Sequence, residues 1–168
     1  EHANQNWYWL PGWSFDALIF EALMAELPGQ HWVMRWSDHH GSFDDCARAL
    51  AATAKPGAIW VGWSLGGALA MRAAALASEK PATVVTLATG RRFCKPDADS
   101  AWGMDPQVFA DFSAGLQQQP EKTLKRFLML CAQGYAERKT LASRLAEYQH
   151  SAADHNLAHS LSWLGVTP

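Results

Sequence analysis

The stretch AIWVGWSLGGALA, residues 58–70, joins an apolar run to an alanine-rich helical pattern through a serine between glycines. It contains the pattern G-x-S-x-G at Gly62, Ser64 and Gly66. A serine on a tight turn between a buried strand and a helix is typical of a nucleophile elbow, where the flanking glycines avoid clashes. We therefore expect Ser64 to be a nucleophile, with the backbone N–H of Leu65 directed at a developing oxyanion. The alternative is a glycine-rich turn that only packs closely.

Short apolar runs alternate with helical patterns on both sides of this stretch. The pattern predicts strands at residues 7–10, 32–36, 58–61 and 83–88, and helices at residues 15–27, 42 to about 55, and 65–77. Ser42, with Asp45 three residues later, marks the start of the second helix. This rhythm of strand and helix predicts an α/β fold, with a mostly parallel sheet and helices on both faces.

The loop after the first strand, Pro11-Gly12-Trp13-Ser14, follows its strand at the same edge of the predicted sheet as Ser64. In such a sheet this loop can supply a second oxyanion donor, the backbone N–H of Trp13. The same residues also fit a turn that begins the helix at Phe15, and both roles can hold together.

Strand patterns disappear after Thr89, and helical patterns follow. We expect helices at residues 105–118, 120–132, 137–149 and, more weakly, 157–164. Placed after four strands, they are predicted to form a cap over the ligand-binding edge of the sheet. The chain then divides into the N-terminal part of the sheet domain, residues 1–90, and a helical cap region, residues 91–168.

Composition restricts the class of protein. The 168 residues fit one ordinary domain, and 49% hydrophobic with 18% charged residues excludes a disordered chain. A net charge of −2 argues against nucleic acid as a partner. No apolar run approaches the roughly 18 residues of a membrane-spanning helix, and no signal peptide pattern is present, so no membrane association is expected. The nine tryptophans are expected to line an interior or a pocket.

The three cysteines, Cys46, Cys94 and Cys131, are widely spaced and form no C-x-x-C pair. This usage indicates a reducing compartment, the cytoplasm, and argues against a disulfide framework or a zinc site. We expect no metal and no organic cofactor, and a monomer.

The sequence resembles the α/β-hydrolases and, within them, the carboxylesterases of the biotin pathway, which cleave the methyl ester of pimeloyl-acyl carrier protein. The resemblance runs from about Trp7 to about Leu161 and rests on LPGW (10–13), AIWVGWSLGGALA (58–70), VTLAT (85–89), RFCKPD (92–97) and EKTLKRFLMLCAQG (121–134). It implies Ser64 as nucleophile and Trp13 with Leu65 as oxyanion donors. It also implies a cap wall along the acyl chain, formed by Phe127, Leu128, Met129, Leu130 and Cys131. Pro11 stands where many relatives carry histidine, which should be tolerable because the oxyanion donors are backbone groups.

A larger departure is the absence of an evident catalytic histidine and acid. On this fold they follow the serine, on loops after later strands, and no strand pattern follows the helices here. Asp154, His155 and His159 have the right order but fall in the last cap helix region, where solvated helix positions are expected. His39 and His40 precede Ser64 and are expected to be loop residues. The resemblance therefore implies that the C-terminal strands, on the order of 60 residues, are absent and that the His–Asp pair lies beyond residue 168.

Basic residues outnumber acidic ones over the predicted cap helices. Between residues 120 and 148, Glu121, Glu137 and Glu147 stand against Lys122, Lys125, Arg126, Arg138, Lys139 and Arg144. Acyl carrier proteins are acidic, and in this family the carrier docks on cap arginines. We therefore expect Lys122, Arg126, Arg138, Lys139 and Arg144 to form a carrier-docking patch, the alternative being a solvated cationic face.

The sequence thus predicts a serine carboxylesterase that hydrolyses the methyl ester of pimeloyl-acyl carrier protein. A general short-chain carboxylesterase or a thioesterase would need the same elbow. A carrier-binding protein without catalysis remains the alternative if the native protein ends at Pro168.

Overall fold

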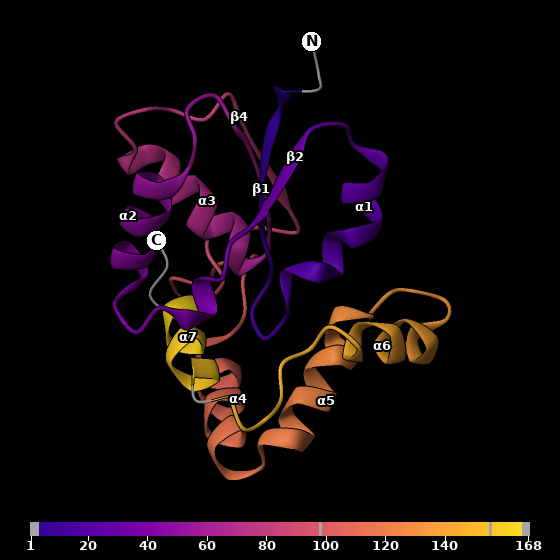
Figure 1. Cartoon of the computed structure of the whole chain (residues 1–168). Helices are drawn as coiled ribbons and strands as arrows, with labels where there is room; N and C mark the ends of the chain where they lie inside the picture. Colours follow the sequence, from indigo (N-terminus) through magenta and orange to yellow (C-terminus); the bar gives the residue numbers. More distant parts are fainter. Residues whose placement is uncertain (1–3, 98, 155, 166–168) are drawn as a thin grey trace.

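A parallel four-stranded sheet lies at the centre of the chain, ordered β2-β1-β3-β4. The computed structural model describes residues 4–97, 99–154 and 156–165. The strands are β1 (Asn6–Leu10), β2 (Gln30–Val33), β3 (Ile59–Trp63) and β4 (Thr83–Leu87) (Figure 1). In the register of the sheet, Gly62 of β3 lies between Leu10 of β1 and Thr86 of β4. The carboxyl ends of β1 and β3, followed by Trp13 and Ser64, therefore meet at one edge.

Helices cover both faces of the sheet, which confirms the predicted fold class. On one face Tyr8, Leu10 and Trp60 are buried against α2 (Phe43–Thr53) and α3 (Leu65–Leu76). On the other face Trp9 and Val61 are buried against the short 3-10 helix η2 (Ala17–Phe20) and the helix α1 (Glu21–Glu26). Alternate residues of a strand point to opposite faces, which is why neighbours in β1 and β3 separate into the two clusters.

Three predicted elements differ from the structure, one of them the helix expected over residues 137–149, which ends at Ala146. The helix expected over residues 15–27 begins only at Ala17, because Phe15 forms an isolated antiparallel bridge with Gln149. The strand expected over residues 32–36 begins at Gln30 and ends at Val33, and Trp36 starts the 3-10 helix η3 (Trp36–Asp38). The Trp36 ring is buried beside Trp163, and its Nε1 donates to the Pro11 oxygen at 3.0 Å. These long-range contacts outweigh the local strand pattern.

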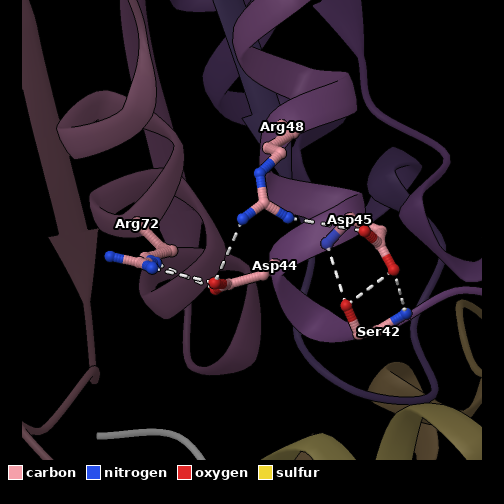
Figure 2. A network of polar contacts seen from close by, with 5 residues as sticks. All are labelled: Ser42, Asp44, Asp45, Arg48 and Arg72. Atoms are coloured by element: carbon pink, nitrogen blue, oxygen red, sulfur yellow. Dashed lines mark hydrogen bonds and ion pairs between the residues drawn. The ribbon is translucent and has the colours of Figure 1, made fainter.

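A polar network ties α2 to α3, the helix that begins after Ser64 (Figure 2). Ser42 and Asp45 form the predicted capping box at the start of α2. One residue before Asp45, Asp44 accepts two hydrogen bonds from the Arg72 guanidinium of α3, both of 2.8 Å. Arg48 lies 3.8 Å from Asp44 and 3.4 Å from Asp45. Beside the buried side chains between the two helices, this paired geometry restrains how α3 lies on α2.

The variant Asp44→Asn is expected to lower the melting temperature at pH 7, with an effect that fades in acid. Hydrogen bonding to Arg72 lowers the pKa of Asp44 in the folded protein. A lowered pKa stabilises the fold above the unfolded-state pKa, and this stabilisation is lost as the pH falls through the folded-state pKa. The difference from wild type should therefore be full above about pH 5 and shrink below about pH 4.

Thermal unfolding of both proteins between pH 7 and pH 3 measures this difference. The variant Asp97→Asn, in the exposed loop after β4, is the control and should show little difference at any pH. A loss of stability for Asp44→Asn that stays constant over the whole range would contradict the ion-pair explanation.

The second half of the described chain is helical and lies at the carboxyl end of the strands (Figure 1). Its helices are α4 (Pro106–Gln118), α5 (Pro120–Cys131), α6 (Arg138–Ala146) and α7 (Asn156–Leu164). No strand follows β4 within the described residues. The main hydrophobic core is continuous from α2 and α3 into α4, α5 and α7, through residues that include Trp13, Phe112 and Leu161.

Candidate active site

Ser64 occupies a strained turn between β3 and α3. Its backbone angles are φ 54° and ψ −117°, in a region that residues with a side chain rarely adopt. Its N–H donates to the Leu87 oxygen at 2.9 Å, and its carbonyl oxygen accepts a hydrogen bond of 3.0 Å from Thr89 Oγ1. Strain of this kind persists only where the surrounding structure holds it, and it is frequent at functional sites.

The glycines around Ser64 are required by close backbone approaches. A Cβ on Gly62 would lie 2.5 Å from both the Gly66 oxygen and the Gly67 nitrogen. A Cβ on Gly66 would collide with the carbonyl oxygens of Leu10 and Pro11. The first turn of α3 therefore lies directly against the end of β1, which is the packing that a nucleophile elbow needs.

Three polar groups at this edge are unpaired within the described part of the chain. These are the Ser64 hydroxyl and the backbone N–H groups of Leu65 and Trp13, none of which has a hydrogen-bond partner there. Leu65 is the first residue of α3, so its N–H belongs to the positive end of the helix. A nucleophile and two available donors thus occur together, as acyl transfer requires.

A pocket of about 360 Å³ opens beside Ser64, between the sheet edge and the helices α5 and α7, which belong to the region that the sequence predicts as a cap. Among the residues that line it are Gly12, Trp13 and Phe15 of the loop after β1, Phe93 and Met104, and Phe127, Leu130 and Cys131 of α5. The wall is mostly apolar and would suit a chain of methylene groups. Burial raises the pKa of the Cys131 thiol to about 11, so this cysteine is a neutral part of the wall.

Only three of the five residues expected in the cap wall line this pocket. Phe127, Leu130 and Cys131 recur at helical spacing and share one face of α5. Leu128 is instead buried with Phe15, Ala132 and Ala142, and Met129 packs against the same cluster. Helical periodicity was the signal that could have separated the two sets.

A second hollow, of about 220 Å³, also reaches Ser64 and was not expected from the sequence. It is lined by Arg72 of α3 and by Arg91 and Arg92 from the loop after β4. The available signal was the position of the two loop arginines, a few residues after β4 at the edge where Ser64 lies.

Neither hollow contains a histidine or a carboxylate among its described lining residues. Asp154 instead accepts a hydrogen bond from the Asn156 N–H at the start of α7. The Nε2 of His159 lies 2.7 Å from the Gly41 oxygen. His155 lies outside the described residues, and His39 lines a different hollow, beside α2. The structure thus brings none of these described groups to Ser64.

The basic residues proposed for carrier docking are exposed on α5 and α6. Lys122 and Arg126 lie one turn apart on α5, whereas Lys139 and Arg144 belong to α6. Arg138 is also exposed, and its Nε donates to the Met129 carbonyl oxygen at 2.9 Å. Arg138 therefore also joins the start of α6 to the end of α5.

Two further properties concern the whole described chain. None of its helices has the length and apolar character needed to traverse a bilayer. Within the same residues, no three His, Cys, Asp or Glu side chains are grouped so that they could hold a metal ion.

Comparison with known sequences relates this chain to known proteins. A family model described as "Alpha/beta hydrolase family" matches residues 8–167. The chain is 35% identical over 145 residues to the pimeloyl-[acyl-carrier protein] methyl ester esterase of Shewanella woodyi, covering 82% of this chain and 57% of that protein. It is 35% identical over 133 residues to the protein of that name from Photobacterium profundum, covering 73% and 51%. The chain thus spans little more than half the length of these curated relatives.

Solved structures show the same fold at low sequence identity. MenH from S. aureus superimposes with a TM-score of 0.71 at 15% identity, over 100% of this chain and 70% of that one. An esterase from Exiguobacterium antarcticum gives a TM-score of 0.69 at 14% identity, over 98% and 67%. At such identities the likeness concerns the fold alone.

Proposed function

The chain belongs to the alpha/beta hydrolase family, and from that membership we propose that the protein carrying it is a serine carboxylesterase with Ser64 as nucleophile. One observation carries the proposal. Ser64 is held at a strained elbow, its hydroxyl has no partner within the described residues, and it lines a mostly apolar pocket with Trp13. A turn that only served close packing would not need a strained serine beside a pocket.

In the proposed mechanism the Ser64 Oγ attacks the ester carbonyl carbon. The carbonyl oxygen becomes an oxyanion and accepts hydrogen bonds from the N–H groups of Leu65 and Trp13, near the positive end of α3. Collapse of the tetrahedral intermediate expels the alcohol and leaves an acyl group on Ser64. Water then attacks that acyl group, releasing the acid and restoring the serine. The general base is proposed to be a histidine, oriented by an acid, from outside residues 1–168.

We propose the methyl ester of pimeloyl-acyl carrier protein as the substrate, with methanol as the expelled alcohol. The names of the two relatives described above support this choice. The apolar wall formed by Phe127, Leu130 and Cys131 would contact the methylene groups of the acyl chain. The three free cysteines agree with a proposed location in the reducing cytoplasm. The proposed state is a monomer that uses no cofactor.

The exposed basic residues of α5 and α6 are proposed to attract the acidic carrier. Reversing two of them, with Lys122→Glu and Arg126→Glu, is expected to lower kcat/KM on the carrier-linked methyl ester by about tenfold or more, mainly through association. Hydrolysis of a small free ester should stay nearly unchanged, because Ser64 and the pocket are untouched. Activity on the carrier-linked ester should also fall as salt rises, since salt screens charges over about 8–10 Å.

Steady-state kinetics of the complete protein on both esters tests this proposal. The variants Lys55→Glu and Lys80→Glu make the same charge change before β3 and β4, at the sheet edge opposite Ser64, and are the charge control. Because Lys80 donates to the Ala74 and Ala75 oxygens and Lys55 lies over the Trp32 ring, the melting temperatures of these variants are measured beside their activity. They should retain activity on the carrier-linked ester. If the Lys122→Glu, Arg126→Glu protein loses kcat/KM equally on both esters, the basic residues have a structural role and the carrier proposal fails.

A further inference from the structure

The loop that carries the Trp13 N–H is buried and conformationally strained. Pro11 to Phe15 are all buried, and the Phe15 N–H donates to the Gly12 oxygen at 3.2 Å, which closes a tight turn. Ser14 in this turn has φ 68°, a left-handed conformation that glycine would adopt at lower cost. Something outside the turn must therefore hold Ser14 in place.

The segment between α6 and α7 supplies these contacts. The Asp16 N–H donates to the Tyr148 oxygen at 2.8 Å, and the His150 N–H donates to the Ser14 oxygen at 2.7 Å. Between them, Phe15 and Gln149 form an antiparallel bridge. Residues 148–150, near the C-terminal end of the described chain, thus pair with the backbone of residues 14–16, near its N-terminal end.

The Gln149 side chain extends this pairing to Ser14 itself. Its Nε2 lies 3.3 Å from Ser14 Oγ and 3.4 Å from the Leu124 oxygen of α5, and it is placed to donate to both. Ser14 is only 2% exposed, so water has little access to replace the side-chain contact. Gln149 therefore connects the strained residue to a cap helix.

The neighbouring Trp13 is attached to the cap by its side chain. Its Nε1 donates to the Leu157 oxygen of α7 at 2.9 Å, and its ring meets Phe112 and Phe127 edge to face, at 5.7 and 5.0 Å between centroids. The backbone of Trp13 lies at the sheet edge, whereas its indole packs among α4, α5 and α7. The direction of its N–H thus depends on where the cap lies.

We propose that Gln149 is a positioning residue for ester hydrolysis, which holds Ser14 at positive φ and thereby aims the Trp13 N–H at the oxyanion. The oxyanion hole is then complete only when the C-terminal helices and residues 148–150 are packed against the loop after β1. This inference rests on the proposed function, because it concerns the same Ser64 reaction.

The variant Gln149→Ala tests the inference in the complete protein. Aligned oxyanion donors act mainly in the transition state, so kcat on a small ester should fall about 10- to 100-fold with KM changed less than about threefold. Hydrogen exchange should accelerate about tenfold or more at the amides of Phe15, Asp16 and His150, while α2 and α3 stay protected. The exposed Gln118→Ala variant on α4 is the matched control and should change neither quantity.

A second variant separates positioning from general damage to the fold. Glycine adopts φ 68° without steric cost and lacks the Oγ that Gln149 contacts, so in the Ser14→Gly protein the turn no longer needs the Gln149 side chain. We therefore compare the fold-loss in kcat that Gln149→Ala causes in two backgrounds. The loss in the Ser14→Gly protein should be smaller than the loss in wild type by a factor of at least about three. A loss of kcat equal in both backgrounds would overturn the inference.

The outcomes distinguish this inference from the proposed function. If wild type hydrolyses esters and Gln149→Ala leaves kcat and the three amides unchanged, the positioning role is excluded and the esterase proposal stands. If wild type hydrolyses no ester, the esterase proposal fails, and with it the role of Gln149 in positioning an oxyanion donor. In that case faster exchange at the three amides would still show that Gln149 holds the loop.

Discussion

Replacing Ser64 by alanine is expected to abolish ester hydrolysis by the complete protein, with a loss in kcat on the order of 10⁶-fold. The reason is that the Ser64 Oγ is the atom proposed to form the covalent acyl intermediate, and the donors around it cannot supply a nucleophile. The fold should persist, because the hydroxyl has no hydrogen-bond partner within the described residues. The measurements are steady-state hydrolysis of a p-nitrophenyl ester and labelling by a fluorophosphonate probe.

The variant Ser78→Ala, at an exposed position after α3, is the control and should keep full activity and full labelling. Mass spectrometry of the labelled wild type should locate the probe on Ser64 and on no other serine. Hydrolysis by Ser64→Ala within about tenfold of wild type would refute the nucleophile assignment, whatever its stability.

The substitution Gly66→Ala is expected to destabilise the protein by about 3 kcal/mol and to remove activity with the elbow geometry. The added Cβ would collide with the carbonyl oxygens of Leu10 and Pro11. These are backbone atoms at the end of β1, so they cannot move aside as the tip of a flexible side chain could. Urea denaturation of the two proteins, followed by tryptophan fluorescence, measures the loss.

Gly90→Ala is the matched control for stability. A Cβ there would meet only the Arg92 oxygen, at 3.4 Å, so the free energy of unfolding should change by less than about 1 kcal/mol. Equal stability of the Gly66→Ala and wild-type proteins would mean that α3 and β1 do not approach each other as closely as the structure shows.

Sequence patterns predicted the elements whose determinants are local. The capping box of Ser42 and Asp45 and the Asp105-Pro106 start of α4 were predicted at the observed positions, since each depends on contacts within a few residues. The strand, serine turn and helix around Ser64 were also predicted, from the G-x-S-x-G pattern and its flanking glycines, although the turn itself is held by residues distant in sequence, Leu87 and Thr89. The glycines of the G-x-S-x-G pattern indicate from the sequence alone that the backbone is closely packed at this turn.

The candidate site was predictable only in part. The loop of Trp13 and the elbow of Ser64 could be placed at one edge, because parallel strands bring their carboxyl ends together. Which residues of α5 reach the pocket could not be settled by listing consecutive positions, since a helix turns 100° per residue. Phe127 lines the pocket, whereas Leu128 packs against Phe15 and Ala142.

By itself, the sequence determined the succession of strands and helices along the chain, the serine elbow, and the helical character of residues 105 onward. Only the tertiary structure decided that Trp36 leaves the strand for an interior packed against Trp163, and that Phe15 pairs with Gln149. The physical reason is the range of the interactions. A helix cap such as that of Ser42 and Asp45 is stabilised by neighbours in sequence, whereas Gln149 reaches Ser14 from 135 positions away, through contacts that exist only once the C-terminal helices have folded onto the sheet.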